Sequence, residues 1–224
     1  MIKVDAAIKT RRLLAEDTME IGFDSPNSFY FQAGQYMTVT VHGLERLPLP
    51  EQFHDFSIAS SPSQTGELAI AFRVSPSHFK QTLLRAPLGT LVNIEGPKGV
   101  FTLLENINQP LIFIAGGIGI TPFMSMISFV VEKKLAYNIT LYYFNRNRES
   151  AAYLEKIERY RSVITFVPIF GLVTKERIIF NAESASAFWY IAGPPGMVSM
   201  VRNILSEKNI KDQNIKTEEF TGYE

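Results

Sequence analysis

The chain has 224 residues, of which 46% are hydrophobic and 12% aromatic, and its 22 basic side chains balance its 22 acidic ones. This length allows one large or two small domains, and the charge balance lacks the basic excess that binding to a nucleic-acid backbone demands. The absence of cysteine excludes disulfides, thiolate zinc sites, iron–sulfur clusters and a cysteine nucleophile.

The three histidines, His42, His54 and His78, lie far apart in the sequence. No pair of them has the spacing of metal ligands, so we expect no metal site. The N-terminal segment lacks the apolar core of a signal peptide. We therefore expect a soluble, cytoplasmic protein.

The first half of the chain, up to about Leu104, consists of short β-type segments separated by turns. One of them, residues 34–41, alternates in polarity and is rich in β-branched residues. A short helix is expected at residues 78–85, with Ser77 as its N-cap. Strands are expected at residues 4–9, 19–23, 34–41, 56–59, 67–74 and 91–95. Six closely spaced strands with one helix indicate a small six-stranded antiparallel β-barrel.

A polar segment, residues 105–110, ends in proline and follows this barrel. We place the domain boundary there. Residues 1–105 would then form the barrel domain, and residues 106–224 a second domain of different architecture.

The second half opens with an uncharged stretch, residues 111–131, which is long enough to suggest a membrane span. Gly116, Gly117 and Gly119 interrupt it after a short strand, and Thr121 and Pro122 suit a helix start, with Thr121 as N-cap. A strand, a glycine turn and a helix N-terminus together bind anions, because free N–H groups face the ligand. We therefore predict a nucleotide site, the alternative being a buried strand–turn–helix without a ligand.

Beyond this stretch, strands and helices alternate along the chain. Strands are expected at residues 139–144, 163–167, 189–192 and 217–220, and helices at residues 151–160 and 197–205. Such alternation indicates a parallel sheet covered by helices, which binds ligands at the carboxyl ends of its strands. The loops at residues 116–122 and 192–197 both lie at such ends and would contact one nucleotide.

The first loop departs from the GxGxxG fingerprint of Rossmann dehydrogenases, because Pro122 occupies the third glycine position. The strand that ends at Phe144 is followed by Asn-Arg-Asn-Arg rather than by the acidic residue that binds a ribose 2′-OH. Both features disfavour a Rossmann dehydrogenase. Arg146 and Arg148 favour the 2′-phosphate of NADPH, Arg146 more so, unless both side chains lie in solvent.

An antiparallel barrel followed by a nucleotide-binding α/β domain resembles the ferredoxin–NADP reductase superfamily over nearly the whole chain. Four motifs carry the resemblance. Residues 54–60 resemble the flavin motif Arg-x-Tyr/Phe-Ser, and residues 96–101 the turn Gly-Pro-x-Gly-x-Phe. Residues 116–122 match the Gly-rich Thr-Pro loop under the nucleotide pyrophosphate, and residues 192–197 resemble Cys-Gly-Pro-x-x-Met beside the nicotinamide. Short bacterial reductases without a fused iron–sulfur domain are the most similar group.

The resemblance implies roles for residues of the barrel. Phe56 would lie against the flavin ring, and Ser57, followed by Ile58, would hydrogen-bond near the reactive nitrogen of the flavin. Ser77 and Lys80 would meet a flavin phosphate or pyrophosphate. The alternatives are an ordinary core strand at residues 56–58 and a solvated helix face at Lys80.

The C-terminus matches the acid-x-aromatic pattern of the family at Glu218 and Phe220. Phe220 would shield the other face of the flavin until nicotinamide displaces it, and Tyr223 is a weaker candidate for that role. Ser57, Glu218 and Phe220 are thus the implied catalytic residues. A terminal core strand would show the same pattern.

The resemblance also implies a set of residues that hold the pyridine nucleotide, in which Thr121 would bridge the two cofactors. With Arg146 from the preceding argument, the set is Gly116, Gly117, Gly119, Thr121, Pro122, Arg146, Gly193, Pro194 and Met197.

Two positions depart from the family pattern. The arginine that binds the flavin pyrophosphate is His54 here, which has a weaker charge and lacks the fork geometry of arginine. Arginine at this position is therefore expected to tighten flavin binding. The cysteine beside the nicotinamide is Ala192, a tolerable change because that cysteine is not a covalent catalyst.

The implied reaction is hydride transfer from NADPH or NADH to bound FAD, or alternatively FMN, followed by electron delivery to a separate acceptor protein or small molecule. One alternative is a flavin reductase that releases its reduced flavin. Another is a flavin- or nucleotide-binding electron-transfer subunit without turnover.

Overall fold

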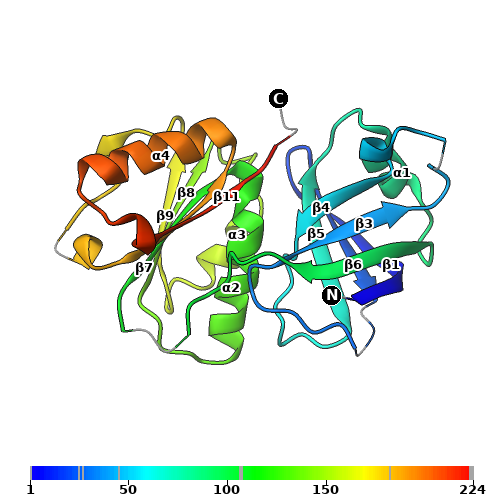
Figure 1. Cartoon of the computed structure of the whole chain (residues 1–224), viewed down its shortest axis with the longest axis horizontal. Coiled ribbons are helices and arrows are strands. Elements are labelled where there is room, and N and C mark those ends of the chain that lie inside the picture. Colours follow the sequence, from blue (N-terminus) through cyan, green and yellow to red (C-terminus); the bar gives the residue numbers. More distant parts are fainter. Residues whose placement is uncertain are drawn as a thin grey trace.

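Figure 1 shows the computed structural model of the chain, which describes residues 2–24, 26, 28–44, 46–105, 108–181 and 183–221. The N-terminal half forms one antiparallel sheet of six strands in the order β4-β3-β6-β1-β2-β5. Its strands are β1 (Ile2–Ala15), β2 (Thr18–Asp24), β3 (Tyr36–Val41), β4 (Phe53–Ser57), β5 (Glu67–Arg73) and β6 (Leu91–Lys98). The two edges approach where the Ala59 N–H donates to the Ala69 carbonyl at 2.8 Å. The predicted six-stranded antiparallel fold is confirmed.

Alternating apolar residues fill the barrel. Ile21, Phe23 and Phe72 are fully buried in it. Burial of each such side chain stabilises the folded state by about 1.5–3 kcal/mol. Helix α1 (His78–Arg85) packs the buried side chain of Phe79 against the same core. Ser77 is the N-cap residue of this helix, as predicted, although its side chain makes no capping hydrogen bond.

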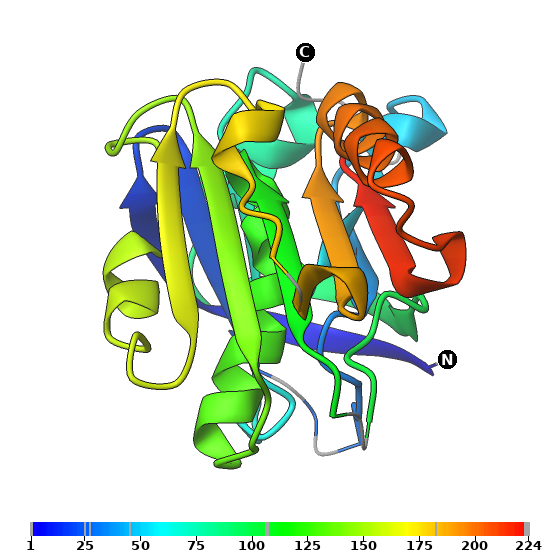
Figure 2. The same ribbon diagram turned by 90° about the vertical axis from the view of Figure 1, so that its left-hand side faces the viewer.

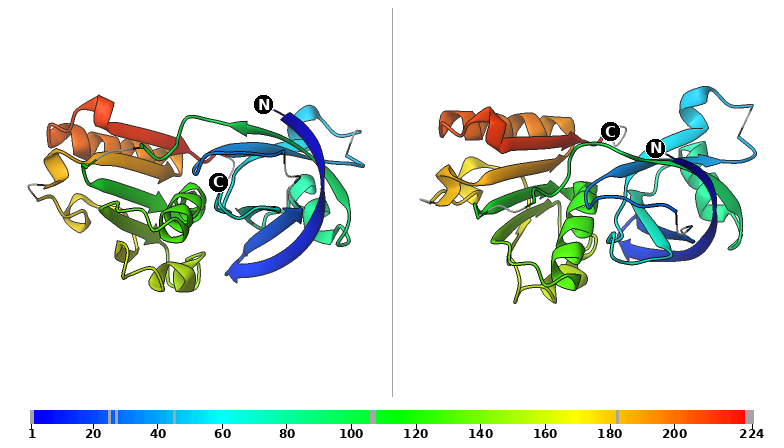
Figure 3. Two further views of the ribbon diagram at one scale, coloured as in Figure 1. Left: turned by 90° about the horizontal axis from the view of Figure 1, so that it is seen from below. Right: turned by 60° about the horizontal axis from the view of Figure 1, so that its bottom comes forward.

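The C-terminal half forms a parallel sheet of five strands in the order β11-β10-β7-β8-β9, seen in Figure 2. Its strands are β7 (Leu111–Gly116), β8 (Ile139–Asn145), β9 (Thr165–Phe170), β10 (Phe188–Gly193) and β11 (Ile215–Glu219). Helices α2 (Thr121–Glu132) and α3 (Leu154–Glu158) cover the face toward the barrel, and α4 (Pro195–Glu207) covers the other face (Figure 3). The predicted parallel α/β domain is confirmed.

Short 3₁₀ turns complete the described elements. They lie at Leu49–Glu51, Gly117–Ile120, Lys175–Arg177, Glu183–Ala185 and Asp212–Asn214. The uncharged stretch at 111–131 thus divides into β7, a 3₁₀ turn and α2, as a strand–turn–helix. Among the described residues, no helix has the length and apolar character needed to cross a membrane.

Several element boundaries differ from the prediction: β1, for example, is predicted at residues 4–9 and covers Ile2–Ala15, and β4 is predicted at residues 56–59 and covers Phe53–Ser57. Helix α3 covers only residues 154–158 because Ser150 and Asn147 form a turn, in which the Ser150 N–H donates to Asn147 Oδ1 at 2.9 Å. Strand β9 begins at Thr165 because the Val163 and Ile164 N–H groups still donate to the Tyr160 carbonyl.

The two halves pack closely together. One apolar cluster contains Ala59, Ala71 and Phe101 of the N-terminal half together with Phe123 and Met126 of α2. The fold changes between the end of β6 and the start of β7, and residues 106 and 107 of the predicted boundary lie outside the described residues. The boundary itself stays a prediction.

Polar contacts also join helix α2 to the barrel. Ser125 Oγ donates to the Ser60 carbonyl at 2.7 Å, and Gln64 Nε2 donates to Glu132 Oε1 at 2.6 Å. These contacts at two points of α2, together with the shared apolar cluster, set how the two sheets face each other.

Candidate functional site

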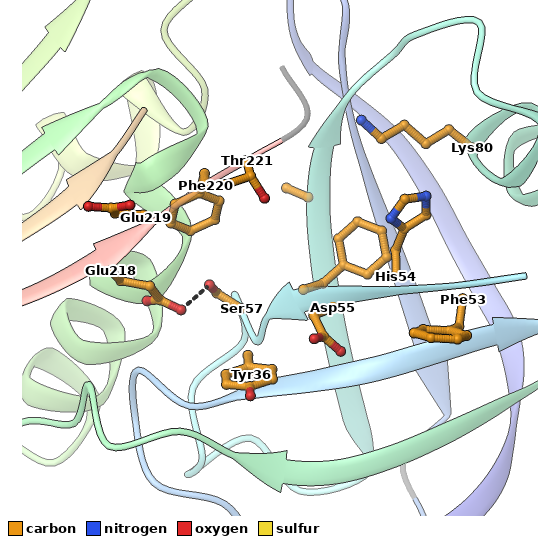
Figure 4. A pocket seen from close by; sticks show the side chains of 12 residues that line it. Tyr36, Phe53, His54, Asp55, Ser57, Lys80, Glu218, Glu219, Phe220 and Thr221 are labelled. Atoms are coloured by element: carbon orange, nitrogen blue, oxygen red, sulfur yellow. Dashed lines mark hydrogen bonds between the residues drawn. The ribbon is translucent and has the colours of Figure 1, made fainter. Parts of the chain in front are cut away.

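A cavity of about 590 Å³ lies between the barrel and the end of strand β11 (Figure 4). Both halves of the chain contribute to its walls. Its lining residues are Tyr36, Phe53, His54, Asp55, Phe56, Ser57, Ala71, Lys80, Glu218, Glu219, Phe220 and Thr221. The structure thus brings together the predicted flavin motif of the barrel and the predicted C-terminal motif.

Strand β4 supplies one wall of this cavity. Because side chains alternate along a strand, His54 and Phe56 lie on the same face. The Phe56 ring is only 5% exposed and packs between Phe72, at 5.7 Å between ring centroids, and Phe79, at 6.0 Å. The aromatic wall is therefore held rigidly by the barrel core.

Ser57, at the end of β4, contacts the other domain. Its Oγ donates to Glu218 Oε1 at 3.3 Å. Burial raises the pKa of the Glu218 carboxyl to about 7, against the smaller lowering effect of the Ser57 hydrogen bond. The second oxygen, Oε2, is buried and has no hydrogen-bond partner among the described residues. This pair therefore offers a carboxyl group that gains or loses its proton near neutral pH.

Phe220, like Phe56, lines this cavity, and Figure 4 shows the Phe220 ring near the end of strand β11. Its N–H donates to the Gly193 carbonyl at 3.0 Å, which fixes the end of the chain to the loop after β10. Tyr223, the weaker candidate for this position, lies outside the described residues.

Two side chains with basic nitrogen atoms, His54 and Lys80, lie at the end of the cavity away from Glu218 (Figure 4). The His54 ring meets Phe79 edge-on at 4.7 Å between centroids, and the Lys80 side chain is only 5% exposed. Burial, followed by the charge of Lys80, lowers the pKa of His54. Burial also lowers the pKa of Lys80.

These residues fit a flavin dinucleotide. Phe56 and Phe220 offer aromatic surfaces, Ser57 and Glu218 offer hydrogen bonds that include a buried oxygen without a partner, and Lys80 offers a positive charge. Two other predicted flavin residues lie elsewhere. Ile58 is fully buried in the barrel core, and Ser77 is not among the lining residues; the roles of both stay predictions.

A second cavity, of about 420 Å³, lies at the carboxyl ends of the parallel strands. The order of the strands reverses between β7 and β10, and sheets of this kind bind nucleotides at such a switch point. The lining residues are Arg73, Gly116, Gly117, Phe144, Asn145, Arg146, Gly171, Leu172, Val173, Pro194 and Met197. The structure therefore brings five of the predicted nucleotide residues into one site.

The three glycines of the first loop differ in what a side chain at each position would contact. A Cβ on Gly117, whose φ is +54°, would lie no closer than 3.6 Å to another residue, Arg73. A Cβ on Gly119 would lie 2.3 Å from the Ala192 carbonyl oxygen, and one on Gly116 would lie 2.2 Å from Met197 Sδ. Close packing against the backbone of β10 therefore explains Gly119, a reason that the sequence did not reveal, whereas the contact at Gly116 is with the flexible Met197 side chain of α4.

Thr121 is part of helix α2 and does not cap it. The 3₁₀ turn before the helix makes Ile120 the cap residue, and Thr121 has helical dihedral angles. Its hydroxyl donates to the Ile118 carbonyl at 3.0 Å, and the residue is 1% exposed. The predicted N-cap role is wrong, whereas Pro122 lies in the first helical turn as predicted.

Arg73 is a site residue that sequence reasoning missed. It comes from β5 of the barrel, yet its Nη2 donates to the Ser150 carbonyl of the other domain at 3.1 Å and the residue lines the nucleotide cavity. No motif marked it, because its place depends on how the two domains pack. Arg146 is exposed and lines the same cavity, whereas Arg148 lines a different one.

Comparisons with known proteins match both halves of the chain. A family model for an FAD-binding domain matches residues 4–101, and one for an oxidoreductase NAD-binding domain matches residues 113–166. The chain belongs to the ferredoxin–NADP reductase superfamily. Within this superfamily it is an NAD(P)H-dependent flavin oxidoreductase whose cofactor is FAD.

Related sequences include two electron transfer components of dioxygenases. The chain is 25% identical to that of anthranilate 1,2-dioxygenase from Acinetobacter baylyi, over 98% of this chain and 67% of the relative. It is 28% identical to the electron transfer component of toluate 1,2-dioxygenase from Pseudomonas putida, over 97% of this chain and 67% of the relative. The reductase component of propane 2-monooxygenase from Mycolicibacterium goodii is 26% identical, over 88% and 61%. The chain thus spans about two thirds or less of the length of these relatives.

Solved structures share the fold. The Amycolatopsis cytochrome P450 reductase GcoB superposes with a TM-score of 0.85 at 21% identity, covering 98% of this chain and 71% of that one. The ferredoxin–NADP+ reductase of Plasmodium falciparum superposes with a TM-score of 0.80 at 18% identity, covering 97% and 96%.

Proposed function

We propose that this reductase passes a hydride from NADPH or NADH to FAD in the 590 Å³ cavity and then delivers electrons to a separate acceptor. The observation that carries the proposal is the contact of Ser57 with Glu218, because it joins the flavin motif to the C-terminal motif inside that cavity. FAD, when bound, supplies the redox chemistry by accepting a hydride and releasing electrons singly or in pairs.

The protein's part is to bind, orient and exclude water. Phe56, fixed by the barrel core, would cover one face of the flavin ring. Phe220 would cover the other face and exclude water until nicotinamide takes its place. The Ser57 hydroxyl, oriented by Glu218, would hydrogen-bond the ring near its reactive nitrogen.

Glu218 would hold a proton for this site. With its pKa near 7, the carboxyl is protonated in a large fraction of molecules at neutral pH and can donate its hydrogen to a neighbouring acceptor. The buried Oε2 atom is available for such a contact.

The nucleotide would occupy the 420 Å³ cavity. Gly117 leaves its backbone accessible there, and Arg73 offers a positive charge from the opposite domain. Arg146, exposed at the edge of the same cavity, would pair with the 2′-phosphate of NADPH. We therefore propose a preference for NADPH over NADH.

The acceptor is proposed from the relatives. Two of them are electron transfer components of dioxygenases and one is the reductase component of a monooxygenase. An oxygenase or another redox protein is therefore the acceptor that the comparisons favour for this chain, with a small molecule as the alternative.

One observation favours a second function, that of a flavin reductase that releases its product. His54 replaces the arginine that the family motif carries, and a neutral imidazole holds a pyrophosphate less firmly than a guanidinium does. A regulatory subunit that binds both cofactors without turnover is the third function to be tested.

Reconstitution with FAD separates these functions. The FAD-loaded protein is passed through a desalting column, and NADPH oxidation is then followed with ferricyanide as acceptor. If the proposal is correct, the flavin stays with the protein on the column, and NADPH is then oxidised without added free flavin. Turnover that requires excess free flavin and follows its concentration would favour the flavin reductase, and bound flavin without any NADPH or NADH oxidation would favour the subunit without turnover.

A further inference from the structure

Lys216 joins the last strand of the parallel sheet to the segment that leads out of the barrel. It lies on β11, an edge strand of that sheet that pairs with β10. Its Nζ donates to the carbonyl of Thr102, in the segment between β6 and β7, at 3.1 Å. The same Nζ lies 5.3 Å from the centre of the Tyr190 ring, whose face attracts a cation. The strand that carries Glu218 is therefore tied by a side chain to the connection between the two halves of the chain.

Tyr190 takes part in the same contact from the neighbouring strand β10. Its hydroxyl donates to the Thr102 carbonyl at 2.9 Å and accepts a hydrogen bond from the Leu104 N–H at 3.2 Å. Phe101, which is buried, packs its ring edge-on against the Tyr190 ring at 5.3 Å between centroids. The segment after β6 is thus held to β10 and β11 by polar and by aromatic contacts.

The register of the two strands places this contact next to Glu218. Lys216 pairs with Tyr190 in the parallel ladder, and Glu218, two residues further along and on the same face, pairs with Ala192. Lys216 and Glu218 both line a cavity of about 520 Å³ that adjoins the 590 Å³ cavity, since Glu218 and Tyr36 line both. A displacement of β11 at Lys216 would therefore move the Glu218 carboxyl.

The hydrogen bond between Ser57 and Glu218 is sensitive to such a displacement. Its length of 3.3 Å is long for a bond between two oxygen atoms, so a small shift of β11 away from the barrel breaks it. We propose that Lys216 is a positioning residue of the flavin site, which holds β11 so that Glu218 meets Ser57 there. This proposal rests on the proposed function, in which that pair contacts the flavin ring.

Lys216→Met tests this role without leaving a buried acceptor unpaired, because Tyr190 still donates to the Thr102 carbonyl. Lys216→Arg keeps the charge, can donate to the same carbonyl and stacks well on an aromatic ring. Lys208→Met is the matched control. Lys208 also lies over an aromatic ring, that of Phe180 at 5.2 Å, but it lines neither cofactor cavity. Thermal unfolding verifies that each variant is folded.

The first measurement is the pKa of the Glu218 carboxyl in the FAD-free protein, by nuclear magnetic resonance of an isotope-labelled side chain. In the natural chain burial raises this pKa to about 7. Lys216→Met should lower it by about one unit, because a strand that moves away from the barrel admits water to the carboxyl. If Lys216 acted only through its charge, its removal would raise the pKa instead. Lys216→Arg and Lys208→Met should leave the pKa unchanged.

The second measurement is the rate at which NADPH reduces the FAD-loaded protein. Lys216→Met should slow reduction about three- to tenfold, whereas Lys216→Arg and Lys208→Met should stay within about twofold of the natural rate. In a Glu218→Ala background, Lys216→Met should slow reduction by less than about a further twofold. The reason is that substitutions acting through the same group are not additive.

The outcomes separate this role from the proposed function. An unchanged or raised Glu218 pKa, or an unchanged rate, in a folded Lys216→Met variant would overturn the assignment of Lys216 while leaving the proposed function intact. Equal slowing with and without the Glu218 carboxyl would overturn it as well, because Lys216 would then act independently of Glu218. A natural chain whose flavin neither NADPH nor NADH reduces would overturn the proposed function, whereas a lowered Glu218 pKa in the FAD-free Lys216→Met protein would still support the positioning of Glu218 by Lys216.

Discussion

The hydroxyl of Ser57 in the barrel donates a 3.3 Å hydrogen bond to Oε1 of Glu218 in the last strand of the other domain, 161 residues later in the sequence. The contact lies in the wall of the cofactor cavity, where the two domains meet. It leaves the buried Oε2 atom of Glu218 without a hydrogen-bond partner in the part of the chain that the structure describes. A flavin in this cavity would therefore meet a hydrogen-bonding pair to which both domains contribute.

Replacement of Ser57 by alanine should slow flavin reduction. It removes the hydroxyl that donates to Glu218 and that would also contact the flavin, and the loss of one such hydrogen bond corresponds to about tenfold in rate. FAD affinity should change by less than about threefold, because the ring wall and Lys80 remain. The measurement is rapid mixing of the FAD-loaded variant with NADPH without oxygen.

Ser128→Ala is the control for this serine. The Ser128 hydroxyl is buried in α2 and has no hydrogen-bond partner among the described residues, and it lies outside both cavities. Its replacement should leave the rate of flavin reduction unchanged. Reduction of the Ser57→Ala protein at the natural rate would remove Ser57 from the catalytic site.

Glu218 should make the stability of the FAD-free protein depend on pH. Its pKa is raised from 4.5 to about 7, so the folded state binds a proton more tightly than the unfolded state does. The contribution of this carboxyl to stability is therefore present below pH 4.5 and is lost as the pH rises toward 7. The loss amounts to at most about 3 kcal/mol.

Denaturant unfolding of the natural chain and of Glu218→Gln at pH 5 and pH 8 measures this effect. Relative to the glutamine variant, the natural chain should be less stable at pH 8 than at pH 5. The exposed neighbour Glu219 provides the control. The free energy of unfolding should differ between the natural chain and Glu219→Gln by the same amount at pH 5 and at pH 8. A Glu218→Gln difference that does not change with pH would contradict the buried, protonated carboxyl.

Gly119 should prove to be a packing residue. A Cβ there would lie 2.3 Å from the Ala192 carbonyl oxygen, so Gly119→Ala forces a shift of β10 and should destabilise the fold by about 1–3 kcal/mol. Gly196→Ala, in the first turn of α4, places its Cβ in open space and should be neutral or slightly stabilising. Thermal unfolding compares the two variants. Equal stability of both would show that the loop can adjust to a side chain at residue 119.

Arg146 should determine the preference for NADPH. A charged pair with the 2′-phosphate contributes about 1.5–3 kcal/mol, so the natural chain should favour NADPH by about ten- to a hundredfold in kcat/KM. Arg146→Ala should remove most of that preference. Arg148→Ala, in a different cavity, should keep it. A natural preference for NADH, or a ratio that Arg146→Ala leaves unchanged, would exclude Arg146 from the nucleotide site.

The stretch from Leu111 to Val131 illustrates how far sequence alone could lead. Its lack of charge and its glycines predicted a strand, a turn and a helix, and the structure contains all three. The role of Thr121 was not predictable, because a 3₁₀ turn moves the helix start and the hydroxyl then bonds within that turn. The reason for Gly119 depends on the backbone of β10, which is distant in sequence.

Contacts between the domains set the limit of prediction for the site. Ser57 and Glu218 were each recognised from a short motif, but their hydrogen bond depends on how the barrel and the parallel sheet pack. Arg73 illustrates the same limit more strongly, since it belongs to a barrel strand and carries no motif, yet it lines the nucleotide cavity. Local sequence patterns determine strands and turns, whereas such contacts depend on the surfaces of both domains.

Anaerobic titration of the FAD-loaded protein with NADPH tests the central claim most directly. The account predicts that the visible absorbance of the bound flavin is lost as one NADPH is added per FAD, and that it returns when ferricyanide is added. Flavin that remains bound and oxidised in the presence of excess NADPH and of excess NADH would contradict the account.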